Sequence, residues 1–182
     1  MKSIILYGSQ YGSARRYALE LSRQTGVPAF RYQDAPPISG QEMVVYIGAL
    51  YAGSVLGLTK SWRGLSLHDG QKVVIATVGL ADSKIPSIRD NIRSSLQKQL
   101  PSGLYERATF FHLQGAIDYQ KLSFIHRTMM AMLHHLLQIK SAGVRKEEDR
   151  VLMETYGKQA DFVDFTALAP IAEEIKRLRD SR

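Results

Sequence analysis

Apolar residues along this chain fall into two kinds of segment, short continuous runs and longer stretches with helical spacing. The short runs are rich in β-branched residues, which is typical of strands buried on both faces. They cover 3–7, 43–48, 72–78 and 108–113, with a weaker run at 29–32. Helical spacing occurs between them, at 14–24, 56–65, 85–100 and 122–139. Strands that alternate with helices predict parallel βαβ units with right-handed crossovers.

The C-terminal part predicts two further helices, at 146–156 before Gly157 and at 167–179 after Asp164 or Thr166 as a cap. Within 122–139, apolar side chains share one helical face, namely those of Leu122, Ile125, Met129, Met132, Leu133 and Leu136. This stripe predicts a last crossover-type helix that packs on the sheet, and the alternative is contact with a flat apolar ligand or lipid. The nearby histidines lack metal-ligand spacing, so we predict no metal site.

Length and composition narrow the possible chemistry. A chain of 182 residues fits one domain, which we expect to span 1–182. The sequence has no cysteine, which excludes disulfides, thiolate metal sites and a cysteine nucleophile, so redox chemistry would need a bound cofactor. No segment is long and apolar enough to span a membrane, and the N-terminus does not resemble a signal peptide. We therefore expect a cytoplasmic protein.

The chain is basic, with 24 Lys and Arg against 17 Asp and Glu and a net charge of +7. Most of the excess lies in residues 1–144, which hold 16 of the basic and 8 of the acidic residues. Such a charge favours an anionic partner. A phosphate-bearing cofactor, a carboxylate substrate, an acidic membrane surface and nucleic acid all meet that condition, so charge alone does not choose among them.

The segment after the first strand runs through a small-residue turn directly into a helix. Gly8 and Gly12 let the backbone approach an anion, Ser9 and Ser13 offer hydroxyl donors, and free amides lie at the helix start. This arrangement predicts a phosphate site, and the alternative is an ordinary turn capped by Ser13. A Walker loop and the G-x-G-x-x-G pattern are both absent. The acidic residues of a phosphoacceptor receiver domain are missing from the strand ends.

Three later loops belong to the same edge of the predicted sheet. Residues 47–54 contain Tyr51, a candidate for stacking on a planar ring that could instead simply cover the sheet edge. Residues 78–82 form the next loop at this edge, in which Asp82 could cap the helix that follows. The last strand leads into another small-residue turn at Gln114 and Gly115. Ligand loops of parallel α/β sheets gather at this edge.

The first loop resembles the phosphate loop of flavodoxins, (S/T)-x-T-G-x-T. Ser9 and Gly12 match it, Tyr11 stands where threonine is common, and Ala14 departs from the final hydroxyl position, for which Ser13 can compensate. The resemblance implies a flavodoxin-like α/β fold, with a doubly wound five-stranded parallel sheet of order 2-1-3-4-5 in three α/β/α layers. It also implies non-covalently bound FMN. The implied FMN contacts are Ser9, Gln10, Tyr11, Gly12, Ser13, Ala14, Ala49, Leu50, Tyr51, Ala52, Gly53, Thr77, Val78, Gly79, Asp82, Gln114 and Gly115.

Nearly the whole chain resembles a flavodoxin-domain family that includes the short quinone-dependent protoporphyrinogen oxidases. The resemblance is carried by 115–124, the methionine-rich 129–133, and the pairs 156–157 and 161–162. It implies an FMN enzyme that dehydrogenates protoporphyrinogen and passes electrons to a quinone or another acceptor. The alternatives are a non-catalytic electron carrier with FMN and, given Ala14, a scaffold without flavin affinity.

Plain flavodoxins are usually acidic, so the positive charge favours an anionic substrate or the inner face of the membrane as a peripheral partner. We expect no nucleic-acid partner. No catalytic acid or base is assigned, because dehydrogenation by a flavin can require only correct placement of the substrate.

Overall fold

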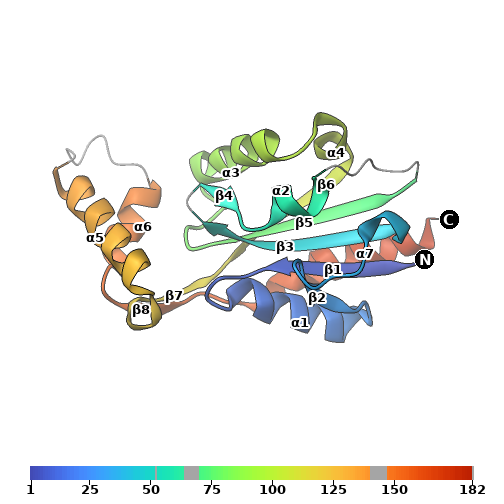
Figure 1. Ribbon diagram of the computed structural model, residues 1–182, viewed down its shortest axis with the longest axis horizontal. Helices are drawn as coiled ribbons and strands as arrows, with labels where there is room; N and C mark the ends of the chain where they lie inside the picture. The colour runs from blue at the N-terminus through green and yellow to red at the C-terminus, as the bar shows by residue number, and fades with distance from the viewer. Residues whose placement is uncertain (52, 64–69, 140–146, 182) are drawn as a thin grey trace.

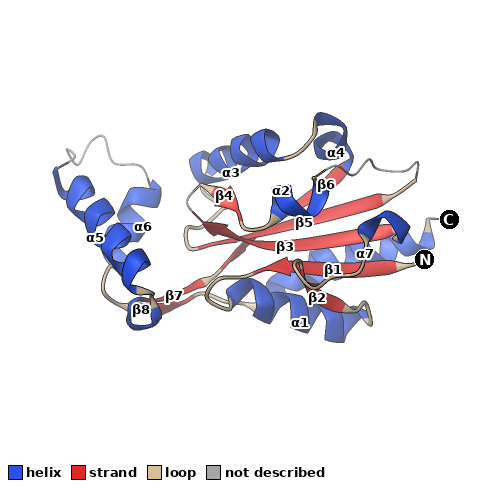
Figure 2. Ribbon diagram, viewed as in Figure 1, coloured by secondary structure: helices blue, strands red, loops and turns tan. Residues whose placement is uncertain are grey.

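The apolar runs form a central sheet of parallel strands, drawn red in Figure 2. The computed structural model describes residues 1–51, 53–63, 70–139 and 147–181. The strand order is β2-β1-β3-β5-β6, which confirms the predicted order 2-1-3-4-5 of five parallel strands. These strands are β1 (Ser3–Gly8), β2 (Ala29–Arg31), β3 (Met43–Tyr51), β5 (Lys72–Gly79) and β6 (Ala108–Gln114). The short β4 (Ser54–Val55) pairs antiparallel with the end of β3.

Both faces of this sheet are buried, which explains why its strands appear in the sequence as continuous apolar runs. Ile5, Val45 and Val74 are paired in register and belong to the core on one face. The residues directly before them belong to the core on the opposite face. Because side chains alternate along a strand, every position in these runs needs an apolar residue.

Helices cover both faces and so make the three predicted layers (Figure 1). One face packs against α1 (Ser13–Thr25) and α7 (Ala169–Asp180). The other packs against α2 (Leu58–Trp62), α3 (Pro86–Gln99) and α4 (Ser102–Arg107). The helix predicted over 56–65 begins later, at Leu58, because the preceding Gly57 adopts a left-handed φ of 81°. Residues 64 and 65 of that prediction lie outside the described residues.

The described residues also contain three short 3-10 segments, η1 (Ile38–Gly40), η2 (Tyr119–Lys121) and η4 (Phe165–Leu168). Asp164 caps η4, because the Asp164 side chain accepts a hydrogen bond from the Thr166 amide at 2.9 Å. It does not cap the helix predicted over 167–179, because α7 (Ala169–Asp180) begins after Leu168 without a side-chain cap. Thus the chain enters η4 and then α7, whose Ile171 and Ile175 are buried against the sheet.

Two helices stand apart from the sheet, at the left of Figure 1. They are α5 (Phe124–Ile139) and α6 (Glu147–Thr155), here called the helical insert. The insert follows β7 (Ala116–Asp118) and precedes β8 (Gln159–Asp161), and these two strands form a separate antiparallel pair. Among the described residues, none of the helices has the length and hydropathy needed to cross a membrane.

The expectation that 122–139 packs on the sheet is wrong. This helix, α5, lies against α6, and Leu137 is its buried residue. The β7–β8 pair carries the chain past the sheet edge before α5 begins, and α7 takes the place on the sheet instead. The apolar stripe of α5 is therefore directed to the end of the sheet and to solvent.

Candidate functional site

The carboxyl ends of β1, β3, β5 and β6 meet at one edge of the sheet, where a cavity of about 420 Å³ opens. This volume lies within the range of roughly 300 to 1,000 Å³ that is usual for small-molecule sites. The cavity brings together most of the site residues predicted from the sequence. Those that line it are Ser9, Gln10, Tyr11, Ser13, Ala49, Leu50, Tyr51, Gly53, Val78, Gly79 and Gly115.

The first loop presents the start of α1 to the cavity. Gly12 is the N-cap of α1 with a left-handed φ of 100°, and its amide donates to Ser9 Oγ at 3.1 Å. Ser13 does not cap the helix, contrary to the alternative considered above. Its Oγ instead accepts a hydrogen bond from the Ala116 amide at 2.9 Å, which ties α1 to the start of β7. The Ser13 hydroxyl also donates to the Ala116 carbonyl at 3.5 Å. The Ser9 hydroxyl, which accepts from the Gly12 amide, still has a proton to donate to a ligand.

The electrostatics of this helix start suit an anion. The first turn of α1 has no acidic residue, so nothing offsets the partial positive charge of its free amides. Gly12 has open space where a side chain would lie. Ala14, in contrast, is fully buried in the core below α1 and does not line the cavity, so the final position of the phosphate-loop pattern contributes packing here.

Four other predicted contacts lie away from the cavity or cannot be placed. Thr77 is fully buried, and its hydroxyl hydrogen-bonds with His112 Nδ1 at 2.8 Å. The side chain of Gln114 donates to the Leu80 carbonyl at 3.4 Å. Asp82 accepts from the Lys84 amide in a turn before α3, and neither caps that helix nor lines the cavity. Ala52 lies outside the described residues.

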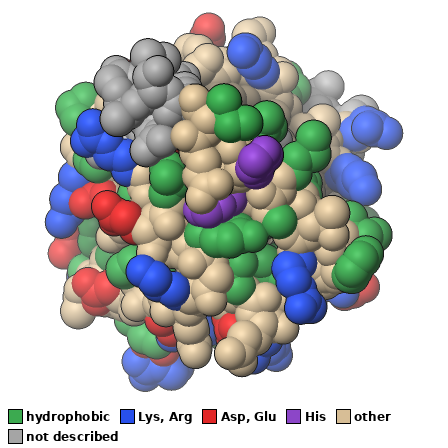
Figure 3. Space-filling view, turned by 90° about the vertical axis from the view of Figure 1, so that its left-hand side faces the viewer, with side chains coloured by type: hydrophobic (Ala, Val, Ile, Leu, Met, Phe, Trp, Pro, Cys, Tyr) green, Lys and Arg blue, Asp and Glu red, His purple; other side chains and the backbone are tan. Residues whose placement is uncertain are grey.

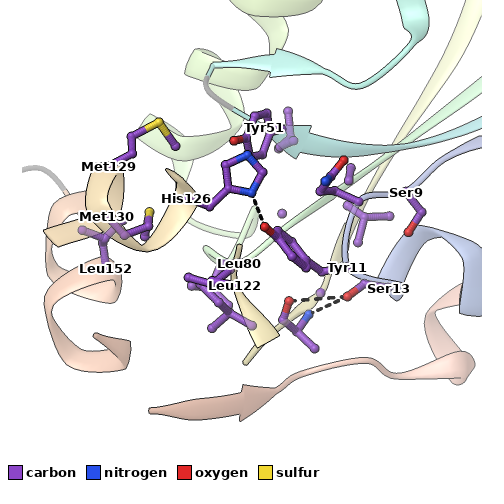
Figure 4. A pocket seen from close by; sticks show the side chains of 18 of the residues that line it. Ser9, Tyr11, Ser13, Tyr51, Leu80, Leu122, His126, Met129, Met130 and Leu152 are labelled. Carbon is purple, nitrogen blue, oxygen red and sulfur yellow. Dashed lines mark hydrogen bonds between the residues drawn. The ribbon is translucent and has the colours of Figure 1, made fainter. Parts of the chain in front are cut away.

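An aromatic row crosses the cavity (Figure 4). The Tyr11 hydroxyl hydrogen-bonds with His126 Nδ1, and the two ring centroids lie 5.7 Å apart at nearly right angles. The ring of Tyr51 lies on the other side of His126, with centroids 5.0 Å apart. Desolvation by burial, and to a lesser extent the neighbouring Tyr11, raises the pKa of Tyr51 above its ordinary value. Tyr51 lines the cavity, as predicted for a site residue.

The remaining wall comes from the helical insert, whose residues were not predicted as part of the site. His126, Met129, Met130 and Leu133 of α5 and Leu152 of α6 all line the cavity. Leu122, just before α5, and Leu80, Ala116 and Ile117, beside the predicted loops, complete the lining. The apolar stripe of 122–139 was the available signal, but its spacing does not reveal what the stripe packs against.

Two braces hold the loops in place beneath the cavity. The Tyr17 hydroxyl donates to the Gln114 carbonyl at 2.8 Å and accepts from the Asp164 amide at 2.9 Å. Arg16 Nη1 lies 2.7 Å from Asp161 Oδ2, which links α1 to β8 at the base of the insert. Three segments distant in sequence, α1, the end of β6 and the chain after β8, are thereby fixed to one another.

Two glycines allow the loops to approach closely. A Cβ on Gly79 would lie 2.9 Å from Leu50 Cδ1, and one on Gly115 would lie 3.0 Å from Val78 Cγ1. Within the described part of the chain, no group of three or more His, Cys, Asp or Glu side chains converges to hold a metal. The site is a mostly apolar cavity with the start of α1 at one end and the rings of Tyr11 and Tyr51 across it.

Solved structures with a similar chain path include several flavoproteins, and no curated protein matches the chain. A mutant of flavodoxin from Pseudomonas aeruginosa is 18% identical, with 72% of this chain and 93% of that chain covered and a TM-score of 0.44. A flavodoxin from the domain Archaea is 12% identical, with 97% and 99% covered and a TM-score of 0.42. A flavoprotein in complex with FMN from Lactobacillus acidophilus NCFM is 8% identical, with 62% and 91% covered and a TM-score of 0.42.

The family assignment rests on a match of a different kind. The family model of the flavodoxin domain matches residues 4–142, which run from β1 through β6 and include all of α5. The matched segment includes all four loops around the cavity and the parallel strands that position them. The chain belongs to the flavodoxin-domain family.

Proposed function

We propose that this protein binds FMN non-covalently in the cavity at the carboxyl edge of the sheet and acts in flavin redox chemistry. The observation that carries the proposal is the meeting of a free helix start with an apolar slot crossed by two tyrosines. FMN has the same two parts, a phosphate and a planar ring system. When bound, FMN supplies the capacity to accept and donate electrons.

The residues present fit this cofactor. Ser9, Gln10 and Ser13 surround the start of α1 and would hold the phosphate together with the helix amides. Tyr51, beside Leu50 at the end of β3, would contact the flat face of the ring. Backbone amides after β5, where Gly79 lies close to Leu50, would face the ring edge and stabilise negative charge there. Ala14 does not weaken this arrangement, because it lies in the core.

We further propose that the protein is an oxidoreductase of the protoporphyrinogen-dehydrogenating type, with a quinone as electron acceptor. The support is the helical insert, because α5 and α6 add an apolar wall of Met129, Met130, Leu133 and Leu152 to the cavity. A wall of this kind can hold a large flat substrate against the sheet edge and exclude water. An electron carrier needs only an exposed cofactor edge, so the insert favours the enzyme over the carrier.

The same insert supports peripheral contact with a membrane surface. Ile125, Met132, Leu136 and Ile139 of α5 have exposed fractions of 75, 67, 53 and 70%. Figure 3 shows this end of the molecule, with hydrophobic and histidine side chains near the middle of the view and both basic and acidic side chains around them. An exposed apolar helix face with basic residues nearby is typical of interfacial helices.

Vesicle flotation tests this contact. Anionic vesicles should carry the protein, neutral vesicles should carry less of it, and Ile125→Gln should reduce flotation. Ala131→Gln is the matched control, because Ala131 is exposed on the same helix but lies outside the apolar stripe. Equal flotation of the two variants would contradict membrane contact through this face.

The redox function is tested on the protein loaded with FMN under anaerobic conditions. Protoporphyrinogen should bleach the flavin absorbance, and menadione, added next, should restore it. Leu133→Trp should slow the bleaching by protoporphyrinogen, because the large ring would fill the wall of the cavity. FMN that stays oxidised with protoporphyrinogen, but is reduced chemically and reoxidised by menadione, would contradict the enzyme and favour the carrier.

A further inference from the structure

The helical insert adds a titratable side chain, His126 of α5, to the cavity. The His126 ring lies between those of Tyr11 and Tyr51, with centroids 5.7 and 5.0 Å away. Among the described residues, no carboxylate, lysine or arginine lines the cavity. An imidazole exchanges a proton between roughly pH 5 and 8, whereas a phenol does so only at higher pH. His126 is therefore the side chain of the cavity that suits proton uptake near neutral pH.

The contact with Tyr11 decides which ring nitrogen of His126 would take up that proton. Nδ1 is hydrogen-bonded with the Tyr11 hydroxyl, and Figure 4 shows the other ring nitrogen on the side of the ring away from Tyr11. A hydrogen bond at one nitrogen of an imidazole sets its tautomer. When Nδ1–H donates to the Tyr11 oxygen, Nε2 keeps its lone pair, which is the acceptor that a general base requires.

The surroundings of His126 also suit the positive charge that protonation creates. The Tyr11 oxygen can accept from Nδ1–H in the neutral and in the protonated ring. An aromatic ring attracts a cation within ~6 Å of its centroid, and the Tyr51 centroid lies 5.0 Å from that of His126. Because His126 is only partly buried, a proton taken up there can pass on to solvent.

We propose that His126 is a catalytic base in the dehydrogenation of the substrate and that Tyr11 is its positioning residue. This inference rests on the proposed function. Oxidation of one methylene bridge of a porphyrinogen breaks a C–H bond of the bridge and the N–H bond of a neighbouring pyrrole, and it forms the double bond that conjugates the two rings. The hydrogen of the C–H bond leaves with its electron pair, for which FMN is the acceptor. Nε2 of His126 takes up the N–H proton and then releases it to water.

The rate at which protoporphyrinogen bleaches the flavin tests the role of His126. It is measured anaerobically at pH 7, with each variant saturated with FMN. We expect His126→Ala to slow the bleaching about 100-fold or more, a typical contribution of a general base, and His135→Ala to leave it unchanged. His135 is the matched control, because it is an exposed histidine of the same helix that does not line the cavity.

Chemical rescue separates proton uptake from simple filling of the cavity. Added imidazole should restore the rate of His126→Ala, because it can take up the proton in place of the missing side chain. Thiazole, a ring of similar size that stays unprotonated at pH 7, should not restore it. Rescue by both rings to the same extent would overturn the inference, because His126 would then only fill space.

The tautomer of His126 tests the role of Tyr11 without turnover. Nitrogen NMR of the protein, before and after FMN is added, should show the hydrogen of the neutral ring on Nδ1. Tyr11→Phe keeps the aromatic ring but removes the hydroxyl, so it should move this hydrogen towards Nε2 and slow the bleaching. A hydrogen on Nε2 in the parent protein would overturn the inference.

Failure of this inference can be told apart from failure of the proposed function. Bleaching of the parent together with equally fast bleaching of His126→Ala would overturn the inference and leave the proposed function standing. A parent protein that holds FMN but is not bleached by protoporphyrinogen would overturn both.

Discussion

Removal of the Tyr17 hydroxyl tests the brace beneath the site. The Tyr17 side chain is fully buried, and its hydroxyl joins the Gln114 carbonyl and the Asp164 amide through bonds of 2.8 and 2.9 Å. Tyr17→Phe keeps the ring, which packs edge-on against Phe165 with centroids 5.8 Å apart. The change therefore deletes two hydrogen bonds without opening a large cavity in the core.

Each deleted hydrogen bond is worth about 0.5–1.5 kcal/mol, so Tyr17→Phe should lower the free energy of unfolding by about 1–3 kcal/mol. For a chain of this size, a loss of about 2 kcal/mol corresponds to a fall in Tm of roughly 4–8 °C. Urea unfolding followed by circular dichroism at pH 7 measures the change in free energy. Thermal unfolding followed by the same signal gives the shift in Tm.

Tyr119→Phe is the matched control. The Tyr119 hydroxyl is also buried, but it has no hydrogen-bond partner among the described residues. Burying an unpaired polar group is unfavourable, so its removal should leave stability unchanged or increase it. The reasoning is refuted if Tyr17→Phe unfolds at the same urea concentration as the parent, or if Tyr119→Phe is destabilised by as much.

Two further predictions concern the sheet. Gly48→Ala should lower the free energy of unfolding by about 1–3 kcal/mol, because the added Cβ would lie 2.2 Å from Val55 Cγ1. Gly40→Ala is the control and should have little effect in the same urea assay, because no atom lies within 4 Å of its added Cβ. Equal effects of the two substitutions would contradict the packing described for β3. Burial, followed by the charges of Arg93 and Arg89, lowers the pKa of His112 below its ordinary value of 6.5. The unfolded chain therefore binds a proton that the folded protein does not as pH falls below about 6.5, so stability should be lost from there downward. His112→Gln should show a smaller loss between pH 7.5 and 5.5, and an identical loss in both proteins would contradict this assignment.

The parallel sheet could be predicted because each of its strands has its own continuous run of apolar residues, and this pattern repeats along the chain. Residues on both faces of β3 and β5 are buried, so these strands appear in the sequence as continuous apolar runs, which strands with one exposed face do not need. The position of the loops then followed from topology, because all carboxyl ends of parallel strands lie at one edge. For this reason Tyr11, Tyr51 and Gly79 could be assigned to one site from the sequence alone, and all three line the cavity.

The helical insert could not be placed in the same way. The strands β7 and β8 have only three residues each and no apolar pattern, so nothing local indicated an antiparallel pair there. The stripe on α5 has the same spacing whether it packs on a sheet, lines a cavity or faces solvent. His126 was missed as a site residue because its contacts with Tyr11 and Tyr51 depend entirely on where α5 lies.

Individual contacts also depended on tertiary structure. Thr77 was assigned to the site from its place at the end of β5, but it is buried and hydrogen-bonds with His112, its partner on the neighbouring strand β6. Asp82 was a plausible helix cap, yet α3 begins only at Pro86, after a turn that uses the Asp82 carboxylate locally. Whether such a residue lines the cavity or caps a helix depends on the exact residue at which a strand ends or a helix begins. Spacing in the sequence does not fix that residue.

The central claim, FMN bound at this edge of the sheet, is tested most directly by titrating the FMN-free protein with FMN and following the flavin fluorescence. We predict saturable one-to-one binding that Tyr51→Ala weakens and that Tyr105→Ala leaves unchanged, because Tyr105 packs on Phe110 away from the cavity. Fluorescence that does not saturate, or equal affinities for FMN in the parent and Tyr51→Ala, would contradict the assignment of this cavity.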